Sequence, residues 1–165
     1  MLQRPGRGSR FEICLPRALA PAAEATAPAG PEPGAAAATG ETVVVIEDDE
    51  QVRRTTTRTL ARAGYDVVDA PTLEQALARL EAHPRPPALL LTDVRMPGRS
   101  GPEVAAALSR RFPGLPVVYM SGYSSEDPGG PSRLPGGAVF VQKPFSPDGL
   151  LAQIRQALDG PTAAA

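Results

Sequence analysis

Short apolar runs alternate with segments of helical periodicity along residues 42–158. The first run, residues 42–46, is apolar without interruption, which is typical of a strand covered on both faces in a parallel sheet, and four further short runs rich in apolar residues follow it. The predicted strands cover residues 42–46, 65–68, 88–91, 115–120 and 138–141. The pattern therefore predicts a parallel five-stranded sheet built from repeated β-α units.

Helix start and stop signals lie between these strands. A first helix is predicted over residues 51–63, and Gly64 follows it as the C′ residue. Thr72 begins a capping-box pattern, Pro102 suits the first position of a helix, and Ser146 can cap the last one. Helices alternating with parallel strands must cover both faces of the sheet, so the sequence indicates a doubly wound α/β fold.

Residues 124–137 depart from this alternation, because 7 of these 14 residues are proline or glycine. Each interior proline costs a helix about 3 kcal/mol and each glycine about 1 kcal/mol. Leu134 is the only large aliphatic residue in the segment, so packing cannot offset this cost. We expect the helix between the last two strands to be short or absent.

Charged and hydroxyl side chains follow the predicted strands. In an open parallel sheet, the functional crevice lies at the carboxyl ends of the strands, so these side chains are expected to converge. The residues are Glu47, Asp48, Asp49, Thr92, Asp93, Ser121 and Lys143. Carboxylates placed together repel one another, and Mg²⁺ would relieve that repulsion. One carboxylate could instead act as a nucleophile toward a phosphoryl group, with a hydroxyl and an ammonium stabilising the transferred charge.

The composition argues against several classes of function. The formal net charge is −1, so no basic surface for nucleic acid or for an anionic membrane is visible. A single cysteine, Cys14, and a single histidine, His83, exclude an internal disulfide and a zinc site. No apolar run is long enough to span a membrane, so we expect a cytoplasmic location. Lys143 is the only lysine among 17 basic residues, and a compact ammonium suits contact with a phosphate.

The amino-terminal region has a different composition. Of the 23 residues in the range 18–40, 18 are alanine, proline or glycine, which predicts a flexible linker with nothing to bury. The folded domain is therefore expected over residues 41–159, with a short tail at 160–165. Taken singly, each site residue has an ordinary structural explanation: a charge at a helix start, a turn residue or a core side chain.

Taken together, the domain resembles the receiver domain of bacterial two-component response regulators. The resemblance covers residues 41–158 and implies a flavodoxin-like (βα)5 fold with strand order 2-1-3-4-5. It also implies a role for each matching residue: Asp93 as phosphoacceptor, Glu47 and Asp48 as the acidic pair for Mg²⁺, the Arg95 carbonyl as a further ligand, Ser121 as the hydroxyl, Phe140 as the switch aromatic, and Lys143, before a cis Pro144, as the phosphate-binding lysine.

Gly6 and Gly8 form a Gly-x-Gly pattern shortly before residues 11–15. With this pattern, residues 1–17 resemble the last glycine box and closing strand of the ATP-binding domain of sensor histidine kinases. Phe11, Ile13 and Leu15 alternate as in a half-buried strand. This resemblance implies the carboxyl-terminal receiver of a hybrid kinase, although a chance match in an unrelated tail is the alternative. With no sheet to join, we expect the segment to be disordered. No DNA-binding domain is expected after Ala165.

The resemblance implies a phosphoacceptor rather than a metabolic enzyme. Its partner would be a sensor histidine kinase or a histidine phosphotransfer protein, and Asp93 would take the phosphoryl group with Mg²⁺. A pseudo-receiver that only binds proteins is the alternative. A haloacid-dehalogenase-type hydrolase would need a second aspartate where this chain has Arg95. A flavin-binding flavodoxin is disfavoured because the carboxylates would repel the flavin phosphate.

Overall fold

The computed structural model describes residues 2–3, 9–10, 40–122 and 138–160 of the chain. It divides into two units, residues 1–36 and 37–165. In the first unit, β1 (Leu2–Gln3) pairs with β2 (Ser9–Arg10) in antiparallel register. Residues 1–17 are predicted to be disordered, whereas these four residues form a short antiparallel pair with each other. The predicted strand at residues 11–15 and most of the predicted linker lie outside the described residues.

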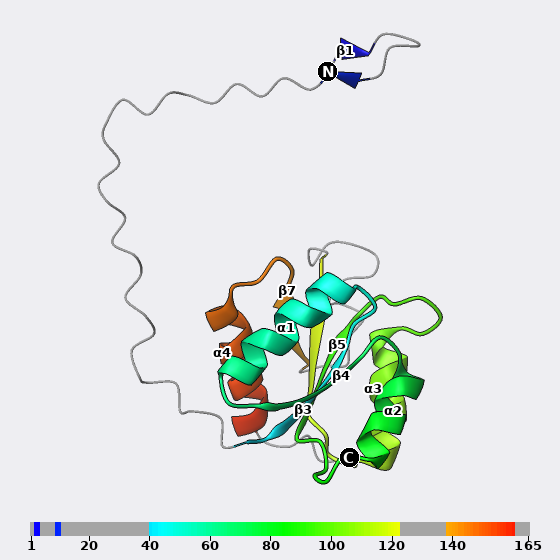
Figure 1. Cartoon of the computed structure of the whole chain (residues 1–165), viewed down its shortest axis with the longest axis vertical. Coiled ribbons are helices and arrows are strands. Elements are labelled where there is room, and N and C mark those ends of the chain that lie inside the picture. Colours follow the sequence, from blue (N-terminus) through cyan, green and yellow to red (C-terminus); the bar gives the residue numbers. More distant parts are fainter. Residues whose placement is uncertain (1, 4–8, 11–39, 123–137, 161–165) are drawn as a thin grey trace, which may run out of the picture. The chain divides into compact units, whose positions relative to one another are not determined.

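The second unit contains a parallel sheet of five strands in the order β4-β3-β5-β6-β7 (Figure 1). The strands are β3 (Thr42–Ile46), β4 (Asp66–Ala70), β5 (Leu89–Asp93), β6 (Val117–Ser121) and β7 (Val139–Gln142). Counted along this domain, the order is 2-1-3-4-5. The predicted doubly wound, flavodoxin-like fold is confirmed.

The interior strand β3 shows why consecutive apolar residues form this sheet. All five residues of β3 are buried. Val43 and Val45 pack into one core, while Val44 and Ile46 pack into a second core on the opposite face. A strand with both faces covered cannot show the alternation of apolar and polar residues seen at a water-exposed sheet.

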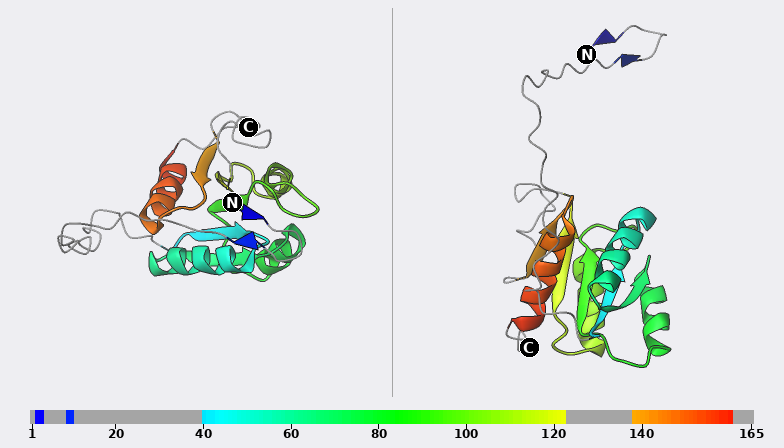
Figure 2. Two further views of the ribbon diagram at one scale, coloured as in Figure 1. Left: turned by 90° about the horizontal axis from the view of Figure 1, so that it is seen from above. Right: turned by 60° about the vertical axis from the view of Figure 1, so that its left-hand side comes forward.

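Four helices are described in this unit, and they cover both faces of the sheet (Figure 2). They are α1 (Glu50–Arg62), α2 (Leu73–Glu81), α3 (Gly101–Arg111) and α4 (Pro147–Asp159). Leu60 of α1 and Ile154 of α4 belong to one core, and Leu80 of α2 and Leu108 of α3 belong to the other. Within the part of the chain that the structure describes, no helix combines the length and apolarity needed to cross a bilayer.

The predicted helix ends are mostly confirmed. Gly64 has φ +94°, Thr72 caps α2 through the Gln75 amide, and Ser146 caps α4 ahead of Pro147. Helix α3 begins at Gly101, one residue before the predicted start. The segment predicted to lack a full helix, residues 124–137, lies outside the described residues.

The strands that end at the site extend beyond their predicted ends. Asp93 is the last residue of β5 and pairs with Met120, and Ser121 is the last residue of β6 and pairs with Gln142. The prediction ended these strands at Leu91 and Met120, where the apolar runs stop. Strand pairing uses backbone groups, so the ladder continues beneath polar side chains.

Candidate functional site

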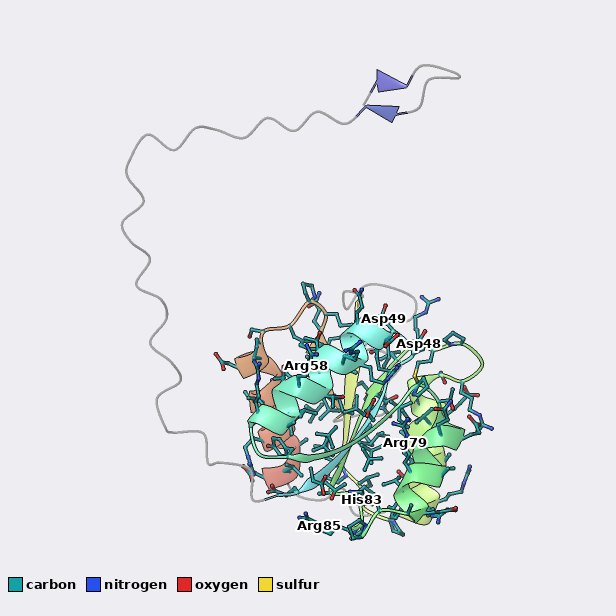
Figure 3. All side chains as sticks on the ribbon, viewed as in Figure 1. Asp48, Asp49, Arg58, Arg79, His83 and Arg85 are labelled. Atoms are coloured by element: carbon teal, nitrogen blue, oxygen red, sulfur yellow. The ribbon has the colours of Figure 1, made fainter. Side chains whose placement is uncertain are left out.

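Three carboxylates converge at the carboxyl edge of the sheet. Glu47 and Asp48 follow β3, and Asp93 ends β5. One oxygen atom from each carboxylate lies within 4.8 Å of those of the other two. Asp48 lies where α1 begins (Figure 3), and its side chain is exposed, whereas Glu47 is buried. The structure therefore brings together the three acidic residues that the sequence singled out.

Lys143 lies between two of these carboxylates. Its Nζ donates to Glu47 Oε2 at 2.6 Å and to Asp93 Oδ2 at 2.8 Å. The Glu47 side chain is only 1% exposed, and those of Lys143 and Asp93 are 19% and 16% exposed. Residues separated by more than forty positions along the chain thus form one charged cluster with restricted access to water.

Burial and the ion pairs act against each other in this cluster. Burial raises the pKa of Glu47, and the nearby ammonium of Lys143 offsets only part of that effect. Burial alone would lower the pKa of Lys143, but its hydrogen bonds and charge interactions with Asp93 and Glu47 together raise it above the ordinary value. Lys143 is therefore charged at neutral pH and offsets part of the negative charge.

Asp49 has a different role from the two acidic residues before it. Its side chain caps α1 by accepting from the amides of Gln51 at 2.8 Å and Val52 at 2.9 Å. These bonds favour the carboxylate and lower the pKa of Asp49. Its own amide donates to Glu47 Oε1 at 3.3 Å. Asp49 thus fixes the start of the helix and leaves Glu47 and Asp48 to form the cluster.

The backbone after β5 holds the Asp93 side chain. The amide of Arg95 donates to Asp93 Oδ1 at 3.2 Å, while Oδ2 accepts from Lys143. The chain then returns through the Arg95–Ser100 bridge, and the Gly101 amide donates to the Val94 carbonyl at 3.0 Å. Both carboxylate oxygens of Asp93 therefore have donors from this chain.

A glycine is required at position 101, because the chain passes close to the backbone of Asp93 there. A β-carbon at position 101 would lie 2.3 Å from the Asp93 carbonyl oxygen, closer than any real contact. The sequence patterns did not single out Gly101, although the capping pair of Ser100 and Glu103 around it marks the start of the helix.

We expect Gly101→Ala to lower the free energy of unfolding by about 1–3 kcal/mol, because the backbone at Asp93 must move to accept the methyl group. Urea denaturation measures this loss. The matched control is Gly122→Ala, since a β-carbon there meets nothing within 4 Å. Equal stability of the two variants would contradict the close-approach argument.

The remaining predicted site residues, Ser121 and Phe140, lie on the strands β6 and β7. Ser121 is buried at the end of β6, and its carbonyl accepts from the Lys143 amide at 2.7 Å. The Lys143–Pro144 peptide bond is cis, as the resemblance implied. Phe140 lies within β7 opposite Tyr119 and packs against the core shared with α2 and α3. Phe140 is therefore part of a hydrophobic core, whereas Ser121 ends its strand at the same sheet edge as the acidic cluster.

The cluster also suits a hard divalent cation. Its ligand atoms are carboxylate oxygens, which Mg²⁺ prefers, and the exposed Asp48 leaves room for the waters that this ion retains. Among the residues that the structure describes, the cluster consists of carboxylates alone, a donor set that suits a hard cation better than a softer transition metal. The donor set thus fits the predicted magnesium.

Comparison with known proteins identifies the family. A family model described as the response regulator receiver domain matches residues 43–155, and this match spans more than half of the chain. The chain therefore belongs to the receiver domain family of two-component response regulators.

Curated relatives match in part of their length. The chain is 32% identical over 101 residues to the DNA-binding transcriptional regulator NtrC of Salmonella typhimurium, covering 61% of this chain and 21% of the relative. It is 31% identical over 121 residues to the phosphate regulon transcriptional regulatory protein PhoB of Pseudomonas aeruginosa, covering 72% and 52%. The chain thus spans about a fifth and about half of these two relatives.

Solved structures match over nearly their whole length. The receiver domain of the hybrid histidine kinase CckA has a TM-score of 0.59 and 30% sequence identity, with 72% of this chain and 99% of that chain covered. The chemotaxis protein CheY4 of Vibrio cholerae has a TM-score of 0.62, 25% identity and the same coverage. Both support the receiver fold of the second unit.

Proposed function

We propose that this receiver domain accepts a phosphoryl group from a phosphohistidine onto Asp93. The donor would be a sensor histidine kinase or a histidine phosphotransfer protein. The observation that carries the proposal is the position of the Asp93 carboxylate, which contacts the Lys143 ammonium and lies close to two further carboxylates at the edge of the sheet. A carboxylate held in this way is a nucleophile whose orientation is fixed before the donor arrives.

Each residue of the site has a role in the proposed transfer. An oxygen of Asp93 attacks phosphorus as the bond to the imidazole breaks. Lys143 contacts Asp93 and is placed to move onto a phosphoryl oxygen as that oxygen becomes an acceptor. The Ser121 hydroxyl is proposed to donate to a second phosphoryl oxygen, and Phe140 to change position as the site becomes phosphorylated.

We propose that the magnesium is held by the acidic pair Glu47 and Asp48, by Asp93, and by the main-chain carbonyl of Arg95. The ion supplies neutralising charge for the carboxylates and the phosphoryl oxygens. Glu47 also pairs with Lys143, so we expect it to set the charge balance of the site, while the exposed Asp48 is the direct ligand. Loss of the phosphoryl group to water would return Asp93 to its free carboxylate.

The setting of the domain is also a proposal. A phosphohistidine donor depends on ATP, so we expect this domain to act in the cytoplasm. Residues 1–17 are proposed to be the end of a kinase ATP-binding domain, which would make this receiver part of a hybrid kinase. We expect partners to be proteins rather than nucleic acid or membrane.

Metal removal tests the proposed function. The chain is incubated with phosphoramidate or acetyl phosphate in Mg²⁺ or in EDTA, and incorporation is measured by intact-protein mass. We expect one phosphoryl group per chain in Mg²⁺ and none in EDTA. Asp48→Asn should behave in Mg²⁺ as the wild type does in EDTA, because its amide is a weak ligand for a hard cation. Incorporation that is unaffected by EDTA would contradict the proposal.

A further inference from the structure

Arg53 contacts the main chain of Glu47 and Asp48, the acidic loop between β3 and α1. Its guanidinium Nη1 donates to the Glu47 carbonyl at 2.7 Å and lies 3.3 Å from the Asp48 carbonyl. Its side chain is 14% exposed, although it stands in the first turn of a surface helix. Within the described residues, it therefore binds the backbone of both acidic residues that precede α1.

The guanidinium is itself held from the other side. Arg53 Nε lies 3.4 Å from Asp69 Oδ2, at the carboxyl end of β4. Arg79 of α2 binds the carbonyl and the carboxylate of Asp69, and Figure 3 shows Arg79 on that helix. A chain of contacts thus links α2, β4 and α1 to the acidic loop.

We propose that Arg53 is a positioning residue that fixes the backbone of Glu47 and Asp48 in the geometry that binds the cation. This role rests on the proposed function. Lys143 and the Asp49 amide hold the side chain of Glu47, and the Glu47 amide donates to the Ala70 carbonyl at 3.2 Å. Arg53 adds a restraint on the carbonyls of Glu47 and Asp48, and through them on the direction in which the exposed Asp48 side chain leaves the backbone.

Two effects of Arg53 on the cation have opposite signs. Its positive charge repels Mg²⁺, so removing the charge alone would strengthen binding. Its hydrogen bonds restrain the loop, so losing them would weaken binding, as residues that orient metal ligands do. The positioning role requires the second effect to exceed the first, so the direction in which Mg²⁺ affinity changes when Arg53 is replaced decides between them.

Calorimetric titration with Mg²⁺ tests this role on the full chain. We expect Arg53→Ala to raise the dissociation constant for Mg²⁺ about tenfold. Arg53→Lys keeps the charge and one donor group, and should recover part of the loss. The matched control is Arg54→Ala, which removes the same charge from the next position, where the side chain is 63% exposed and pairs with Glu50. It should change Mg²⁺ affinity little.

Unchanged or tighter Mg²⁺ binding by a folded Arg53→Ala would overturn the positioning role. Thermal melting in EDTA establishes that the variant is folded at the titration temperature. If it is not, Arg53→Lys decides in its place, because it keeps the positive charge but loses part of the hydrogen bonding to the Glu47 and Asp48 carbonyls; weaker Mg²⁺ binding than in the wild type supports the role, and unchanged binding overturns it. A wild-type chain that binds no Mg²⁺ would instead remove the proposed function, and this role with it.

Discussion

Asp93→Asn is expected to reduce phosphorylation by small donors to background. The amide is nearly the same size as the carboxylate, so the backbone contacts from Arg95 and the return at Gly101 should survive. A neutral amide oxygen is a weak nucleophile, however, and Lys143 would lose one of its two ionised partners. Intact-protein mass after incubation with phosphoramidate and Mg²⁺ measures the loss.

Asp148→Asn is the matched control for this variant. It makes the same change of charge at an exposed position in the first turn of α4, and Asp148 is not one of the three carboxylates that converge. Its phosphorylation should equal that of the wild type. If Asp93→Asn still gained a full phosphoryl group, another residue would have to be the acceptor, and the assignment of Asp93 would be wrong.

The positions of the site residues could be predicted because topology alone determines them. Carboxyl ends of parallel strands meet at one edge, so residues following β3 and β5 must lie near those following β6 and β7. The convergence of Glu47, Asp48, Asp93 and Lys143 follows from this rule, since three strand ends bring them together. The order of the strands came from the resemblance rather than from periodicity.

Contacts made through the backbone could not be predicted in the same way. Arg53 appears in the sequence as one of several arginines on α1, and nothing in its spacing distinguishes it from the exposed Arg54. Gly101 is needed because of a contact with the carbonyl of Asp93, which depends on how the chain turns after β5. The predicted loss of helix at residues 124–137 stays a prediction.

The second large effect concerns the buried ion pair of Glu47 and Lys143. We expect Lys143→Met to lower the free energy of unfolding by about 3 kcal/mol at neutral pH without metal, because it leaves a carboxylate that is 1% exposed without its ammonium. Urea denaturation in EDTA measures this loss. The double variant Glu47→Gln with Lys143→Met should recover much of it, because the unpaired charge is then gone.

The pH dependence of the stability lost in Lys143→Met follows from the directions in which the pKa values of Lys143 and Glu47 are shifted. The pKa of Lys143 is raised in the folded state, so its stabilising contribution is complete at neutral pH and lost only above its ordinary value of 10.5. The pKa of Glu47 is also raised, so folded Glu47 binds its proton more tightly than unfolded Glu47 does. Lys143→Met should therefore regain stability as the pH falls toward the ordinary Glu47 value of 4.5.

Lys143→Arg separates the stabilising role of the charge from its role in transfer. The guanidinium keeps a cation beside Glu47, so the free energy of unfolding should remain near that of the wild type. The planar guanidinium does not fit where a compact ammonium contacts both Glu47 and Asp93 at under 3 Å. Phosphorylation by phosphoramidate, or the signalling response to phosphorylation, should therefore be impaired. If Lys143→Met matched the wild type in stability, the ion pair would contribute little to the fold. If Lys143→Arg matched it in both phosphorylation and response, a positive charge of any shape would suffice at this position.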